Sequence, residues 1–115
     1  MALDPNCIFC KIIEGEIPAD IVYRDENIVA FNDLNPQAPT HVLVVPTLHV
    51  ENAAAVADAS SVLTAAIFKA AKQIASDRGL SGYRTVFNTG ESAGQSVFHA
   101  HLHLLGGRDF TWPPG

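Results

Sequence analysis

Short β-branched and apolar runs separated by polar turns recur along the chain, and they predict a sheet. Residues 21–23 and 28–31 flank the polar turn 24–27, so these two runs are expected to form a β-hairpin. Residues 41–46 are almost all apolar, which predicts a central strand covered on both faces. Two further strands are expected at 83–88 and 97–105.

A helical spacing of apolar residues marks the stretch 58–77. Its apolar stripe consists of Leu63, Ile67, Ala70 and Ile74. Asp58 or Ser60 can cap the start of this helix, and Gly79 can end it. A short helix is expected at 7–13, closed by Gly15, and residues 32–40 should form a loop. One main helix beside antiparallel strands makes an α+β domain.

Composition narrows the class of protein. A chain of 115 residues with 48% hydrophobic residues is expected to form one domain, 1–115. The net charge is −5 and the seven Lys and Arg residues are dispersed, which argues against a nucleic-acid partner. No signal peptide and no run long enough to cross a membrane is evident. We therefore expect a cytoplasmic protein with no membrane partner and with reduced cysteines.

His99, His101 and His103 carry the strongest chemical signal in the chain. Their spacing of two would place all three imidazoles on one face of a strand, roughly 6.6 Å apart, with Ala100, Leu102 and Leu104 behind them. Such a row favours a reaction centre over surface or core histidines. A neutral imidazole can attack phosphorus, and the central His101 has a partner on either side. Three imidazoles so spaced could not all reach one metal ion without distortion.

The polar loop 88–96 precedes this row and contains Gly90 and Gly94. Glycines let the backbone N–H groups approach an anion, so the loop is a candidate phosphate site beside the histidines, the alternative being an ordinary connection. Ser96 could donate a proton to a leaving group. Asp33 has two interpretations as well, turn chemistry or a carboxylate that accepts ribose hydroxyls.

Cys7 and Cys10 form a Cys-x-x-Cys pair. A thioredoxin-like function needs a βαβ context that the pattern does not provide. With His49 and His99 the pair could make a Cys₂His₂ zinc site, whereas plain buried thiols are the alternative.

The chain resembles the histidine-triad (HIT) superfamily, and within it the Hint branch of purine nucleoside phosphoramidases. The resemblance rests on the His-φ-His-φ-His-φ-φ motif at 99–105, on residues 35–41, 94–97 and 104–108, and on the terminal Trp112-Pro113-Pro114-Gly115. It implies five antiparallel strands with one long and one short helix per subunit. It also implies a homodimer whose sheets join into ten strands. The implied activity is hydrolysis of purine nucleoside phosphoramidates and aminoacyl or acyl adenylates to AMP or GMP.

The same resemblance assigns roles to individual residues. His101 matches the nucleophile that forms a covalent nucleotidyl-histidine, supported by His41, His99 and His103. Asn88, Gly94, Ser96 and Val97 match the phosphate site, and Asp33 the ribose contact. The base pocket would be made by Ile8, Phe9, Ile17, Phe31 and Leu34, and Trp112 would reach the partner subunit's active site. Relatives with the cysteine pair often bind zinc through residues that match Cys7, Cys10, His49 and His99.

Attack of an imidazole on phosphorus and hydrolysis of the resulting intermediate need no metal, so any zinc is expected to be structural. Two other functions stay open from the sequence. One is a dinucleoside polyphosphate hydrolase of the Fhit type, which uses the same nucleophile. The other is a nucleotide-binding interaction protein whose role does not require turnover.

Overall fold

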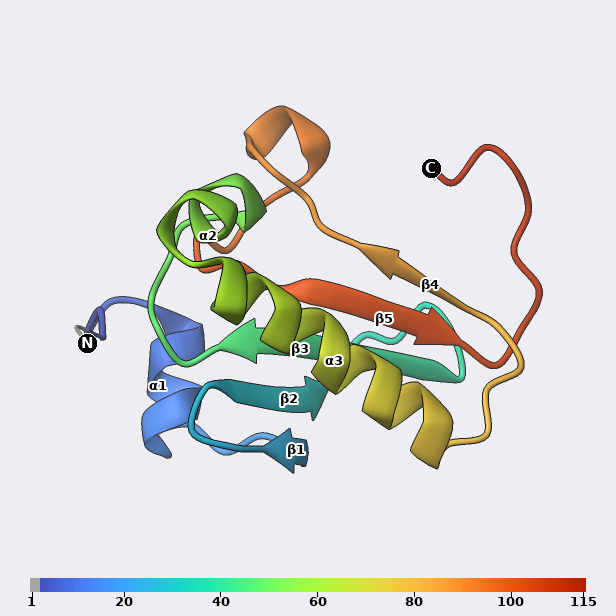
Figure 1. Ribbon diagram of the computed structural model, residues 1–115, viewed down its shortest axis with the longest axis horizontal. Coiled ribbons are helices and arrows are strands. Elements are labelled where there is room, and N and C mark those ends of the chain that lie inside the picture. Colours follow the sequence, from blue (N-terminus) through green and yellow to red (C-terminus); the bar gives the residue numbers. More distant parts are fainter. Residues whose placement is uncertain (1–2) are drawn as a thin grey trace.

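The computed structural model describes residues 3–115, and the first two residues of the N-terminal segment lie outside it. Its centre is a five-stranded antiparallel sheet with the order β1-β2-β3-β5-β4 (Figure 1). The elements are α1 (Ile8–Glu14), β1 (Ile21–Arg24), β2 (Ile28–Asn32), β3 (Thr40–Pro46), α2 (Ala53–Ala59), α3 (Ser61–Asp77), β4 (Tyr83–Val86), the 3₁₀ turn η1 (Glu91–Ala93) and β5 (Leu102–Gly106). The expected α+β architecture, the hairpin of β1 and β2 and the central position of β3 are confirmed.

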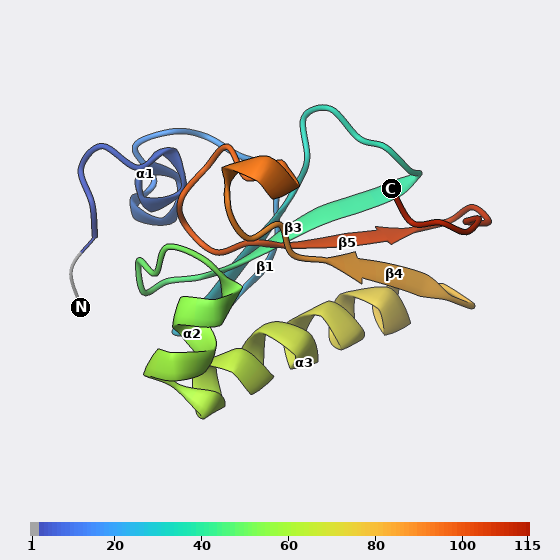
Figure 2. The same cartoon turned by 90° about the horizontal axis from the view of Figure 1, so that it is seen from above.

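Helices cover the two faces of the sheet unequally. The long helix α3 crosses one face, while the short α1 and the loops before β3 and β5 lie on the other (Figure 2). Alternate side chains of β3 point to opposite faces of the sheet. Val42 and Val44 pack in the core under α3, and Leu43 and Val45 pack in a second core with Phe9 of α1. Among residues 3–115, no helix is long and apolar enough to cross a membrane.

The long helix expected over 58–77 is present as α3, but it begins at Ser61 and the separate helix α2 precedes it, so the expectation of two helices in all is wrong. Ser60 has an extended backbone (φ −162°) and separates α2 from α3. Its hydroxyl accepts the N–H of Leu63 at 3.0 Å, so it caps α3, while Asp58 lies inside α2. Asn52 caps α2 by accepting the N–H of Ala55. Each cap gives a partner to a first-turn backbone N–H group that would otherwise have none. The side chains of Asn52 and Ser60 therefore set where α2 and α3 begin.

The expected strand at 97–105 is also wrong in its first half, because β5 begins at Leu102. The β3–β5 ladder ends where Val44 pairs with Leu102. Continued in this register, the ladder would pair Val45 with His101 and then Pro46 with Ala100. Pro46 has no N–H to donate, its carbonyl accepts a hydrogen bond from His99 Nε2 at 2.8 Å, and the N–H of Ala100 donates instead to the carbonyl of Val50 at 2.7 Å. His99 therefore lies in a bend and His101 in irregular backbone before the strand, and only His103 lies within β5. The strand expected at 83–88 likewise ends at Val86.

Candidate active site

His101 is held in one tautomer by its own backbone neighbour. Its Nδ1 lies 2.8 Å from the carbonyl oxygen of His99. A carbonyl can only accept a hydrogen bond, so Nδ1 carries the proton and Nε2 keeps a free lone pair. The ring is 8% exposed and meets the edge of Phe9 at a centroid distance of 5.0 Å. This arrangement presents a neutral, oriented nucleophile that reaches solvent.

A second chain of hydrogen bonds fixes His41 and His103. The backbone N–H of Gln37 donates to His41 Nδ1 at 3.0 Å, so His41 carries its proton on Nε2. That proton is donated to His103 Nδ1 at 2.9 Å, and Asp33 Oδ2 lies 3.4 Å from the same His41 nitrogen. His103 must then carry its proton on Nε2, which is buried and has no partner among residues 3–115. A buried N–H without a partner is costly, and it is typical of a donor that serves a ligand.

Burial keeps these three imidazoles neutral. It lowers the pKa of His103 to about 4, with smaller contributions from the neighbouring His101 and His41. The pKa of His101 is also lowered by burial, partly offset by its bond to the His99 carbonyl. Burial lowers the pKa of His41 too, against the opposing charge of Asp33. At neutral pH the site therefore offers a lone pair on His101 and an N–H donor on His103.

Asp33, His41 and His103 bring three potential metal ligands within 4.8 Å of one another. The tautomers argue against a metal at this point. His41 already uses Nδ1 to accept the Gln37 N–H, so its Nε2 would have to lose a proton to bind a cation. We interpret this group as a hydrogen-bond relay.

The four residues Cys7, Cys10, His49 and His99 form a second cluster, called the Cys–His cluster below. Cys7 Sγ and Cys10 Sγ lie 3.4 and 3.5 Å from His99 Nδ1, and Cys10 Sγ lies 3.2 Å from His49 Nδ1. The two Nδ1 atoms are 3.2 Å apart. A tetrahedral zinc ion with ordinary bond lengths separates sulfur from nitrogen by roughly 3.5 Å and nitrogen from nitrogen by roughly 3.3 Å. The donor set fits zinc in both chemistry and spacing.

The protonation states of this cluster favour a cation. His99 donates its Nε2–H to the carbonyl of Pro46, so its Nδ1 lone pair points at the thiols. Burial lowers the pKa of His99 to about 4 and raises that of Cys10 to about 11. Both groups are therefore neutral without a cation, and a divalent ion would offset the burial penalty of the thiolates. The structure thus places the His99 imidazole in this cluster, while the backbone carbonyl of His99 orients His101.

The residues expected to bind a base and ribose line one cavity. This cavity has a volume of about 190 Å³ and is lined by Ile8, Phe9, Ile17, Phe31, Leu34 and Asp33, together with Ile12 and Leu43, which the sequence did not single out. Phe9 forms its wall and touches His101, so the cavity adjoins the nucleophile. Ile12 and Leu43 were missed because a core residue and a pocket residue have the same sequence pattern.

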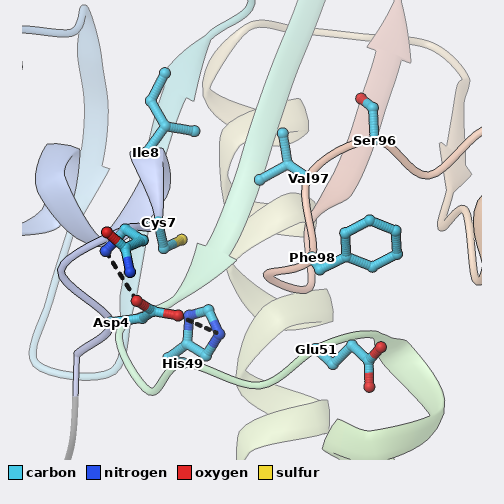
Figure 3. Close-up of a pocket in the computed structure, with 9 residues that line it drawn as sticks. Asp4, Cys7, Ile8, His49, Glu51, Ser96, Val97 and Phe98 are labelled. Atoms are coloured by element: carbon cyan, nitrogen blue, oxygen red, sulfur yellow. Dashed lines mark hydrogen bonds and ion pairs between the residues drawn. The ribbon is translucent and has the colours of Figure 1, made fainter.

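Two of the expected phosphate contacts line a neighbouring, larger cavity. Ser96 and Val97 face Cys7, Ile8 and His49 across a space of about 520 Å³ (Figure 3). Asn88 and Gly94 line neither cavity. Gly94 has φ of +93°, as a residue in a tight phosphate-binding turn would need. Trp112 is 84% exposed on the C-terminal tail and lines neither cavity.

Comparisons with known proteins point to one family. The family described as "Scavenger mRNA decapping enzyme C-term binding" matches residues 6–110. An uncharacterized HIT-like protein of Synechococcus elongatus is 48% identical, over 98% of this chain and 100% of its own length. The chain belongs to the HIT superfamily.

Two further proteins are similar to nearly the whole chain. The 14 kDa zinc-binding protein of Zea mays is 46% identical over 97% of this chain and 90% of its own length. The solved structure of a HIT family hydrolase from Legionella pneumophila is 55% identical, with a TM-score of 0.92, over 96% of this chain and 100% of that one. The fold is therefore that of the HIT family hydrolases.

Proposed function

We propose that this HIT protein hydrolyses purine nucleoside 5′-phosphoramidates, and aminoacyl or acyl adenylates, to AMP or GMP. The observation that carries the proposal is the free Nε2 lone pair of His101, fixed by the bond between Nδ1 and the His99 carbonyl. The likeness to HIT family hydrolases supports hydrolysis as the reaction class. The adjoining apolar cavity supports a nucleoside as the bound group.

In the first step His101 Nε2 attacks the α-phosphorus, and a bond forms between nitrogen and phosphorus as the P–N bond to the amine breaks. The amine is a poor leaving group unless it gains a proton, and we assign the Ser96 hydroxyl to relay one to it from water. The His103 N–H and the Val97 N–H would stabilise charge on the phosphoryl oxygens while the Ser96 hydroxyl donates to the amine.

In the second step water attacks the nucleotidyl-histidine, and the bond from phosphorus to His101 breaks. Water thus supplies the oxygen of the new phosphate and, over both steps, one proton to the amine. His101 returns to its neutral state with the lone pair on Nε2. Dividing one displacement into two is the gain of covalent catalysis.

The nucleoside would be held by the apolar cavity, with its ribose hydroxyls near Asp33. One carboxylate oxygen of Asp33 already accepts the N–H of Asn35 at 2.8 Å, which fixes the side chain. The other oxygen lies toward His41 and has further lone pairs for a hydroxyl.

We further propose that the Cys–His cluster binds a structural zinc ion. Bound zinc would tie the N-terminus of α1 to the segments that carry His49 and His99, and no step of the reaction needs it. The zinc-binding relative from Zea mays supports this assignment.

A cytoplasmic homodimer is the proposed assembly. The exposed Trp112 and the free outer edge of β4 leave surface for a second subunit. Sedimentation of the purified protein would test it, and a monomer at micromolar concentration would contradict it.

The deciding experiment mixes the protein with adenosine 5′-phosphoramidate and a diadenosine polyphosphate and follows the products by phosphorus NMR. We expect faster AMP release from the phosphoramidate and none from a His101→Ala variant that still binds AMP. Preferential cleavage of the polyphosphate would assign the protein to the Fhit type. No turnover of either compound would favour a nucleotide-binding interaction protein.

A further inference from the structure

Gln95 is buried in the middle of the loop proposed to bind phosphate. Its side chain is 3% exposed, although the residues on either side of it are exposed. The Oε1 atom accepts the N–H of Gly90 at 2.9 Å. The Nε2 atom donates to the carbonyls of Glu51 at 2.8 Å and of Val97 at 3.1 Å. Only one orientation of the amide satisfies one donor and two carbonyls, so every polar group of this side chain is used.

These bonds connect three separate parts of the backbone. Gly90 begins the tight turn that contains η1, and its carbonyl also accepts the backbone N–H of Gln95. Val97 follows Ser96, so bonds at 95 and 97 hold the backbone on both sides of the serine. Among residues 3–115, the bond from Gln95 to Glu51 is the only side-chain hydrogen bond that joins residues 88–98 to another part of the chain.

The segment at the other end of this bond is itself anchored. Glu51 lies two residues after His49 of the Cys–His cluster, and the carbonyl of Val50 accepts the N–H of Ala100 at 2.7 Å. Figure 3 shows His49 and Glu51 on one strip of backbone, and Ser96 and Val97 on another, around the same cavity. The amide of Gln95 joins the two strips.

We infer that Gln95 is a positioning residue that holds the Ser96 hydroxyl and the Val97 N–H at the phosphoryl group. This inference rests on the proposed function. Donors aimed at developing charge must be placed before the reaction, and losing one such donor lowers kcat by about 100- to 1000-fold. A donor that is displaced but still present should cost less. We therefore expect kcat/KM to fall about 10- to 100-fold when the Gln95 amide is removed.

The test uses Gln95→Glu, which keeps an acceptor but loses the two N–H donors, and Gln95→Met, which loses all three bonds. Gln73→Glu and Gln73→Met are the matched controls, because Gln73 lies exposed on α3 and bonds only to Asp77. The substrates are the Rp and Sp diastereomers of an adenosine 5′-phosphoramidate with one sulfur on phosphorus. Sulfur accepts hydrogen bonds weakly, so the ratio of their kcat/KM values reports how the loop donors meet each oxygen. That ratio does not depend on how much of a variant is folded.

We expect the wild-type ratio to differ from one and to move toward one in both Gln95 variants. The affinity for AMP should change less than threefold, and the Gln73 variants should match the wild type. An unchanged ratio, or a wild-type ratio of one, would overturn the inference. In the wild type the Gly90 amide proton should also exchange slowly, and fast exchange would overturn the inference even if no variant folds. Absence of wild-type turnover would instead refute the proposed function.

Discussion

Removal of zinc from the Cys–His cluster should lower the stability of this protein much more than its initial rate. The cluster joins Cys7 to His99 across 92 positions of sequence. The α1 helix that carries the cysteines has seven residues, too few to be stable without tertiary contacts. Zinc would therefore act on folding as a cross-link between the N-terminus and the segment before β5.

The size of the effect follows from the length of the closed loop. A covalent link that closes a loop of this length removes unfolded-state entropy worth about 4–5 kcal/mol. For a domain of this size, 1 kcal/mol shifts Tm by roughly 3–5 °C, so we expect chelation to lower Tm by roughly 12–25 °C. Residual binding of zinc to the unfolded thiols would reduce this value.

The assay is calorimetry of zinc-loaded and chelated protein, with initial rates measured well below both transitions. The double variant Cys7→Ser/Cys10→Ser is the control, and its Tm should respond to neither zinc nor chelator. At temperatures where both forms are folded, we expect the initial rate of the chelated protein to lie within about threefold of the rate of the zinc-loaded protein. A Tm change below 2 °C, or loss of the rate before any loss of fold, would refute it.

Three further outcomes are expected. Ser96→Ala should lower kcat about 100- to 1000-fold on a phosphoramidate but less on an acyl adenylate, whose leaving group needs no proton; equal losses would contradict a proton-donor role. Burial lowers the pKa of His103 to about 4, so the free energy of unfolding of metal-free protein should fall as pH drops from 6.5 toward 4, because the unfolded chain then binds the extra proton. Urea titrations that show no change between pH 7 and 5 would contradict this. Ile67→Ala should cost about 2–5 kcal/mol of unfolding free energy, measured the same way, since Ile67 is 1% exposed on the core-facing side of α3.

The sequence predicted the elements that depend on local pattern. The short apolar runs of β1, β2 and β3 and the helical stripe on α3 are local patterns, and the elements that they predicted are confirmed. The break at Ser60 was missed because a serine that caps one helix and ends another has no distinct spacing. The early end of the ladder was missed because it depends on contacts between distant segments: His99 Nε2 bonds to the carbonyl of Pro46, and the N–H of Ala100 donates to the carbonyl of Val50.

The sequence predicted which residues belong to the candidate site better than it predicted how those residues are arranged. Alternation of His99, His101 and His103 suggested a single row, but the imidazoles point to two clusters. The backbone N–H of Gln37 fixes the tautomer of His41, and no sequence pattern records a backbone contact. Gln95 was missed for a related reason, since a buried amide in a polar loop has the composition of an ordinary connection.

The contact between His99 and His101 has a consequence for how these proteins can change over evolutionary time. The tautomer of His101 depends on the carbonyl of residue 99, which every amino acid possesses. The metal cluster depends on the imidazole of the same residue. A lineage could therefore exchange this side chain and both cysteines, and lose the metal, while the nucleophile stays oriented. Position 99 joins the Cys–His cluster to the nucleophile His101 in space but leaves each free to be inherited without the other.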